Sequence, residues 1–181
     1  MEKSKFVFTG SGGQGVITAA IILAEAAVLH ENLNAVQTQV YGAAARGGAT
    51  RTDVIISESE ICYPKVNQPN VLVCLTQEAY MKFSRIIRPG GLLLTDPRYV
   101  RIEQSVDACH VQLPMYQAVM EQIGKPIVFN ICMLGAVVAL SRAVSRESLE
   151  KMLGSRIPPA FLEMNRKALQ LGFDLGAAAA N

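Results

Sequence analysis

The chain has 181 residues, of which 50% are apolar and 18% charged, and its formal net charge is +2. This length suits one domain with a substantial buried core. Because the small positive charge is not gathered into a run of Lys or Arg, the composition gives little support to nucleic-acid binding. We therefore expect a single α/β domain over residues 1–181, with much of its sheet buried.

The N-terminal residues lead directly into the first apolar run and show no signal-peptide pattern. The longest apolar run, 127–140, is shorter than the roughly 20 residues that a membrane span needs and contains Asn130, so we predict no span. The four cysteines lie in or beside apolar runs without a C-x-x-C spacing. We expect buried, reduced thiols, no iron–sulfur or zinc site in this chain, and a cytoplasmic protein.

Residues Phe6 to Leu29 predict a strand, a glycine turn and a helix. Val16 to Leu29 is apolar and rich in Ala, as in a helix with most of its surface covered. At such a turn, backbone N–H groups and the positive helix end converge on an anion. An alternative is that the glycines serve only a sharp turn and close packing. The candidate binding residues of the turn are Gly10, Gly12, Gly13, Gln14 and Gly15.

The glycine spacing is the G-x-G-x-x-G of dinucleotide-binding proteins, which is a weak signal without its second half. That second half is an acid about 20 residues further on, at the end of the second strand. The predicted second strand, Ala35 to Tyr41, has no acid, and Glu31 precedes it. Since a catalytic base is also missing, a conventional NAD dehydrogenase is the least favoured interpretation.

A second loop of small residues follows, from Tyr41 to Gly48. Arg46 is its only strong polar side chain, and Gly47 and Gly48 come directly after it. We expect both glycine loops at the carboxyl ends of neighbouring strands, where ligands bind in open α/β sheets. Arg46, Gly47 and Gly48 are therefore candidate binding residues, with a plain salt bridge as the alternative for Arg46.

The remaining elements alternate between strands and helices. Thr76 and Ser145 are expected as helix N-caps, and residues 175–181 are expected to be flexible. The pattern predicts a three-layer α/β/α, Rossmann-like fold with a largely parallel or mixed sheet and helices on both faces. The further predicted strands are 49–57, 61–63, 71–75, 92–94 and 106–113, and the helices are 77–87, 114–123, 127–143, 145–153 and 159–171.

Conventional catalytic groups are scarce. His30 and His110 are far apart in the sequence, and no nucleophile elbow, Walker loop or metal-spaced cluster occurs. We predict no catalytic residue and no metal site. The residues alone indicate a binding domain without its own reaction centre.

Several motifs carry a family resemblance, and they span most of the chain. They are Gly10 to Val16, Val36 to Gly42, Ala45 to Gly48, Tyr63 to Lys65, Asn130 with Leu134 to Ala136, and the spacing Pro159, Asn165, Ala168 and Gly172. Together they resemble the gamma subunit of 2-oxoacid:ferredoxin oxidoreductases. The second and third motifs are most similar to the 2-oxoglutarate branch rather than the pyruvate branch, although Ala43 and Ala44 stand where that branch has Pro and Glu.

The resemblance implies an enzyme assembled from several chains. Thiamine diphosphate attacks the 2-oxo carbon, CO2 leaves, two electrons pass through 4Fe-4S clusters to ferredoxin, and the acyl group ends on coenzyme A. Thiamine diphosphate and Mg2+ would belong to alpha and beta partners, and the clusters to beta and a ferredoxin-like delta chain. This chain would bind no cofactor tightly and would be inactive alone.

Our hypothesis is that the two glycine loops face the partners' active site and help to close it, with Gln14 and Arg46 as polar contacts. The anion they meet would be a coenzyme A phosphate or a partner carboxylate. One alternative is a stand-alone nucleotide- or coenzyme-A-binding module, and another is a purely structural subunit. The apolar composition also leaves room for a homo-oligomer of the isolated chain.

Overall fold

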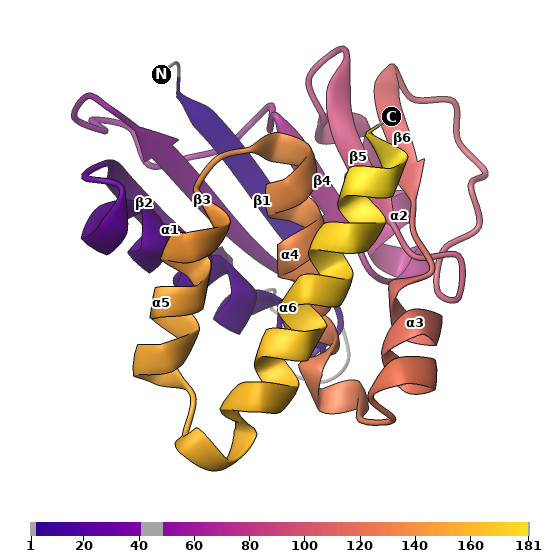
Figure 1. Cartoon of the computed structure of the whole chain (residues 1–181). Helices are drawn as coiled ribbons and strands as arrows, with labels where there is room; N and C mark the ends of the chain where they lie inside the picture. The colour runs from indigo at the N-terminus through magenta and orange to yellow at the C-terminus, as the bar shows by residue number, and fades with distance from the viewer. Residues whose placement is uncertain (1–2, 41–48, 181) are drawn as a thin grey trace.

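A six-stranded sheet in the order β2-β3-β1-β4-β5-β6 forms the centre of the molecule (Figure 1). The computed structural model describes residues 3–40 and 49–180. The strands are β1 (Ser4–Gly10), β2 (Asn34–Val40), β3 (Thr50–Ser57), β4 (Val71–Cys74), β5 (Gly91–Thr95) and β6 (Ala108–Gln112). β1, β4, β5 and β6 pair in parallel, whereas β3 runs antiparallel to both β1 and β2. The predicted mixed, largely parallel sheet is confirmed.

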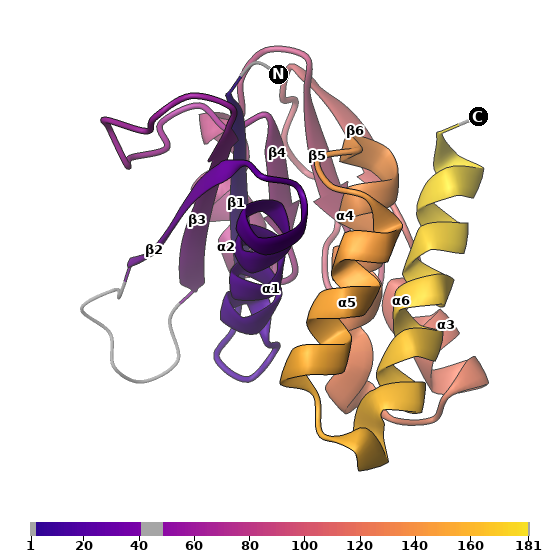
Figure 2. The ribbon, with the colours of Figure 1, turned by 60° about the vertical axis from the view of Figure 1, so that its left-hand side comes forward.

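Helices cover both faces of the sheet, but unequally (Figures 1 and 2). They are α1 (Val16–His30), α2 (Gln77–Phe83), α3 (Met115–Gln122), α4 (Phe129–Ser141), α5 (Arg146–Arg156) and α6 (Pro159–Ala179). One apolar core joins the sheet to α1, α4, α5 and α6, and a smaller core on the opposite face contains residues of α2 and of the segments beside it. The three-layer α/β fold is confirmed, with a thin second helical layer.

Alternation along the strands creates the two cores. In β1, Phe6 and Phe8 belong to the larger core and Val7 to the smaller one, because successive side chains of a strand point to opposite faces. α4 differs, since residues all round it are buried between the sheet and α6. This explains why its sequence is apolar without a polar face.

The last helix is longer than predicted. We expected it to end at about Leu171, but α6 continues to Ala179. Gly172 and Gly176 form part of its buried face, where their missing side chains let the backbone of α4 approach closely. Gly176, in the segment 175–181 that we expected to be flexible, is therefore part of the surface by which α6 packs on α4, whereas residues 177–180 are exposed.

Two other local predictions need correction. Residues 61–63 do not form a strand; Ile61 instead packs against the smaller core as the chain crosses that face towards β4. The helix expected over 77–87 ends as α2 at Phe83, followed by one 3-10 turn, Ser84–Ile86.

Both predicted N-caps are confirmed. The hydroxyl of Thr76 accepts a hydrogen bond from the backbone N–H of Ala79, and Ser145 does the same for Ser148. Among the helices of residues 3–40 and 49–180, none is long and apolar enough to cross a membrane.

Candidate functional site

The glycine turn lies where β1 ends and α1 begins, at the carboxyl edge of the parallel strands. Gly13 and Gly15 have φ of 93° and 71°, a left-handed conformation that side chains rarely adopt. Gly12 and Gly13 are exposed, and a Cβ on either would meet no atom within 4 Å. The turn therefore presents bare backbone to its surroundings.

Gln14 holds the turn together from inside. Its side-chain oxygen accepts from the N–H of Ser11 at 2.8 Å, and its side-chain nitrogen donates to the carbonyl of Leu75 at 3.0 Å. Leu75 follows β4, so the side chain ties the turn to the neighbouring strand. Gly10 makes this possible, because a Cβ there would come within 2.5 Å of the Gln14 side-chain oxygen. Both ends of the Gln14 amide are thus used within the chain.

α1 begins without a side-chain cap, with Gly15 at the N-cap position. The amide of Asn130, in the first turn of α4, lies directly against Gly15, and its nitrogen donates to the Gly15 carbonyl at 3.4 Å. Within residues 3–40 and 49–180, the backbone N–H groups of Gly12, Gly13 and Gly15 find no acceptor. Together with the positive end of the 15-residue α1, these donors can hold an anion such as a phosphate or a carboxylate.

The second predicted loop, Tyr41 to Gly48, lies outside the described residues. The candidate binding residues Arg46, Gly47 and Gly48 belong to this loop. Thr50, at the start of β3, pairs with Gly10, so β3 begins at the same sheet edge as the glycine turn. The backbone N–H of Ala49 donates to the carboxylate of Glu78, in the first turn of α2, at 3.4 Å.

The strand order changes one expectation. β2 was expected beside β1, but β3 lies between them, which separates β2 from β1 by about 10 Å. In dinucleotide-binding proteins of this class, the strand with the ribose-binding acid is the immediate neighbour of the first strand. The topology therefore adds a second objection to an NAD site, besides the missing acid.

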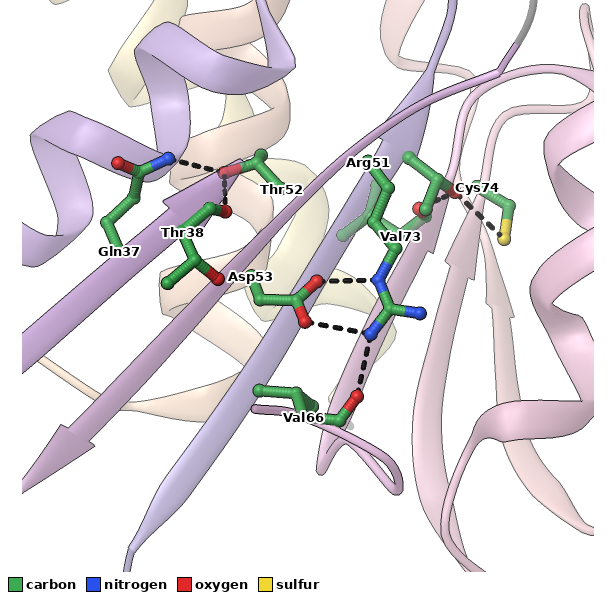
Figure 3. Close-up of polar contacts among 9 residues, drawn as sticks. Gln37, Thr38, Arg51, Thr52, Asp53, Val66, Val73 and Cys74 are labelled. Atoms are coloured by element: carbon green, nitrogen blue, oxygen red, sulfur yellow. Dashed lines mark hydrogen bonds and ion pairs between the residues drawn. The ribbon is translucent and has the colours of Figure 1, made fainter. Parts of the chain in front are cut away.

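An ion pair that the sequence analysis missed lies on the α2 side of β3 (Figure 3). Arg51 contacts both carboxylate oxygens of Asp53 at 2.7 and 2.8 Å and also donates to the carbonyl of Val66 at 2.6 Å. Asp53 is 4% exposed. The Arg-x-Asp spacing within one predicted strand could have indicated this ion pair, since residues two apart in a strand share a face. The pair fastens the crossing segment to the sheet.

The histidine and cysteine side chains of the sheet and helices differ in their burial. His110 contacts Thr95 at 3.2 Å, and burial lowers the pKa of its imidazole. Cys74 and Cys132 are buried, and burial raises the pKa of each thiol to about 12. Cys62 and Cys109 are exposed, so our expectation of four buried thiols was wrong. The described residues contain no group of three His, Cys, Asp or Glu side chains placed to hold a metal ion.

Comparison with known proteins places this geometry in a family. The profile of the pyruvate ferredoxin/flavodoxin oxidoreductase family matches residues 5–175. The chain belongs to this family. It is 43% identical to the 2-oxoglutarate synthase subunit KorC of Methanocaldococcus jannaschii, over 92% of this chain and 90% of the relative. The family resemblance inferred from the motifs is confirmed.

Solved structures agree with this family membership. The gamma subunit of a keto/oxoacid ferredoxin oxidoreductase from Geobacter sulfurreducens superposes with a TM-score of 0.91 at 41% identity, covering 99% of both chains. A chain of the 2-oxoglutarate:ferredoxin oxidoreductase from Magnetococcus marinus has the same fold, with a TM-score of 0.87 at 22% identity. The superposition covers 98% of our chain but only 32% of that longer chain. This fold therefore occurs both as a separate chain and as a part of a larger one.

Proposed function

We propose that the chain is the gamma subunit of a 2-oxoglutarate:ferredoxin oxidoreductase, which converts 2-oxoglutarate to its acyl-coenzyme A. The observation that carries this proposal is the 43% identity to a 2-oxoglutarate synthase subunit over nearly the whole of both chains. Alpha, beta and ferredoxin-like delta subunits would supply thiamine diphosphate, Mg2+ and the 4Fe-4S clusters, and ferredoxin would accept the electrons.

The glycine turn would be this chain's contribution to the shared active site. It lies at the sheet edge that binds ligands in α/β proteins, and its exposed backbone at Gly12 and Gly13 is open enough for close approach. These features fit a phosphate of coenzyme A. They also fit a carboxylate from a partner subunit, and Arg46 would add a positive charge to either.

The assignment is tested by purifying the tagged chain from its native cells without oxygen. Larger thiamine- and cluster-containing chains should co-purify, and the complex should reduce a viologen dye with 2-oxoglutarate in the presence of coenzyme A. Pyruvate and 3-methyl-2-oxobutanoate serve as competing substrates. A single chain with neither partners nor activity would sink the proposal, and faster turnover of pyruvate would correct the substrate.

The role of the turn is tested with two matched variants of the assembled complex. Gly12→Glu places a negative charge at an open position, whereas Gly12→Gln adds a neutral side chain of the same shape. If the turn holds a coenzyme A phosphate, Gly12→Glu should raise the KM for coenzyme A about tenfold or more relative to Gly12→Gln. If it meets a partner carboxylate, Gly12→Glu should instead weaken retention of the subunit. Equal behaviour of the two variants would remove the turn from both roles.

Arg46 is tested separately by Arg46→Ala, with the exposed Arg101→Ala as control. Loss of turnover or a higher KM for coenzyme A in the first variant alone is the expected result. Unchanged kinetics would leave Arg46 as a salt-bridge residue. A stand-alone coenzyme-A-binding module, the competing function, requires micromolar binding by the isolated chain and no partners.

A further inference from the structure

A cavity of about 840 Å3 lies beyond the carboxyl ends of β5 and β6, beside α3. We call it the α3 cavity; it is lined by Asp96, Pro97, Arg98, Pro114, Tyr116, Gln117, Met120 and Glu121. Figure 1 shows α3 beyond the ends of these two strands. The glycine turn is not part of its lining. The cavity is therefore a second feature of the same sheet edge.

Arg98 is the cationic side chain of the α3 cavity. Its guanidinium lies 4.4 Å from the centre of the Tyr116 ring and 5.9 Å from that of Tyr99. Tyr116 is itself fixed by edge contacts with Tyr99 and Phe129 at 5.5 and 5.9 Å. The side chain of Arg98 also makes a hydrogen bond with the Tyr99 side chain. Because a guanidinium has five N–H donors, others remain for a planar, two-pronged partner. No carboxylate of residues 3–40 and 49–180 lies within ion-pair distance of Arg98.

The two acidic side chains of the cavity are held by other groups. Asp96 is fully buried, and its carboxylate accepts from the backbone N–H groups of Arg98 at 2.9 Å and Tyr116 at 2.8 Å. These bonds fix the turn after β5 and the start of α3, and so the position of Arg98. Glu121 accepts from the side-chain nitrogen of Gln117 at 2.8 Å. Neither acid forms a side-chain ion pair with Arg98, although the charge of Arg98 acts on Asp96 and lowers its pKa against the larger rise caused by burial.

We propose that the α3 cavity binds a carboxylate group through Arg98, with the body of the ligand against Pro114, Tyr116 and Met120. The guanidinium fork matches the two oxygens of a carboxylate. A singly charged carboxylate is favoured over a doubly charged phosphate, because Glu121 and Asp96 add negative charge to the same wall. The carboxylate is that of a small organic acid or that of a partner subunit's side chain, which the experiment separates.

The first arm of the test titrates the isolated full chain with benzoate, a carboxylate on a flat apolar ring, and follows the amide signals of Tyr116 and Met120 by NMR. Benzamide is the neutral control ligand. Binding of benzoate should be weakened about tenfold or more in Arg98→Gln, as expected for loss of a hydrogen bond to a charged group. Arg98→Lys, which keeps the charge but not the fork, should recover only part of this. Arg101→Gln, outside the cavity, should match the wild type.

The second arm measures retention of the chain in the assembled complex as salt is raised, for the wild type, Arg98→Gln and Arg101→Gln. An effect of Arg98→Gln confined to benzoate binding identifies a free organic acid as the ligand. Weaker retention of Arg98→Gln alone identifies a partner carboxylate. The proposal is overturned if retention is unchanged in Arg98→Gln and benzoate binding either is unchanged in Arg98→Gln or is no stronger than that of benzamide. Because neither arm depends on the glycine turn, failure here leaves the proposed function untouched.

Discussion

At the scale of single residues, the glycines of the turn have two different roles that the sequence does not distinguish: some allow close packing, and others expose the backbone. Gly10 and Gly15 have no side chain because neighbouring amides occupy the space, whereas Gly12 and Gly13 face outward with nothing near them. Gln14 was proposed as a ligand contact, yet its amide bonds to Ser11 and Leu75 within the chain. Contact with an anion at this turn would therefore fall to backbone N–H groups.

These two roles predict that Gly→Ala changes stability at one position and not at the other. Gly15→Ala should lower the free energy of unfolding by about 2–3 kcal/mol, because its φ of 71° is strained for Ala and the new Cβ would lie 2.6 Å from the Asn130 amide. Gly12→Ala meets nothing within 4 Å and should stay within about 0.5 kcal/mol of the wild type. Urea unfolding of both variants measures this. Equal stability of the two would show that Gly15 is not constrained as the structure has it.

At the scale of elements, helix contacts decide which face of each helix is buried. α4 and α6 approach through glycines: a Cβ on Gly172 would overlap the carbonyl oxygen of Cys132, and one on Gly135 would lie 2.5 Å from the carbonyl oxygen of Leu169. Such close backbone contact is open only to residues without a side chain. It holds α6 along α4 and leaves the other face of α4 to the sheet.

The α4–α6 contact predicts that one substitution has opposite signs at two helical glycines. Gly172→Ala should destabilise the chain by about 3 kcal/mol or more, because α6 must move away from α4. Gly154→Ala, in α5 with open space around it, should stabilise by about 0.5–1 kcal/mol, because Ala loses less conformational entropy on folding. Thermal unfolding of each variant gives the sign. Stabilisation by Gly172→Ala would contradict the observed helix packing.

Glu31 connects the end of α1 to the start of α5. Its carboxylate accepts from the backbone N–H of Ser145 and the hydroxyl of Ser148, both at 2.7 Å. These hydrogen bonds, that from Ser148 most strongly, hold the pKa of Glu31 below its ordinary value. The stabilisation is therefore complete above the ordinary pKa and is lost as the pH falls through the lowered one.

Glu31→Gln should cost about 1 kcal/mol at neutral pH. The difference from the wild type should disappear as the pH falls through the lowered pKa of Glu31, because the wild-type carboxylate then gains its proton. Urea unfolding at neutral pH and at a pH below that pKa measures it. Glu163→Gln, the same change at a side chain that is 79% exposed, is the control and should show little effect at either pH. A difference that persists unchanged at low pH would rule out the carboxylate as its source.

At the scale of the whole molecule, burial sorts the four thiols into two classes. Cys62 and Cys109 are exposed, while Cys74 and Cys132 lie in the cores with pKa values raised to about 12 by burial. Because the thiolate is the reactive form, a buried thiol with a raised pKa is unreactive for two reasons: the reagent cannot reach it, and it does not ionise at neutral pH. The native isolated chain should therefore react at the two exposed cysteines alone.

Titration with a chromogenic disulfide reagent should count two thiols per native chain and four after unfolding in guanidinium. In the assembled complex, loss of reactivity at Cys62 or Cys109 would mark the surface covered by a partner. The variants Cys62→Ser and Cys109→Ser assign each signal. Fast reaction of four thiols in the native chain would mean that the cores are open to solvent.

Local sequence determined much of this protein. Apolar runs predicted the six strands of the sheet, Thr76 and Ser145 marked helix starts, and the glycine spacing placed the turn between β1 and α1, because each signal depends on residues close in sequence. Tertiary structure alone decided that β3 lies antiparallel between β1 and β2 and that the Gln14 side chain donates to the carbonyl of Leu75. It also decided that α6 continues past Gly172 along α4. Arg98 belongs to the same group, since the rings that hold it come from two separate segments. Each of these outcomes depends on which distant backbone or side chain occupies the neighbouring space, and that is a property of the packed chain.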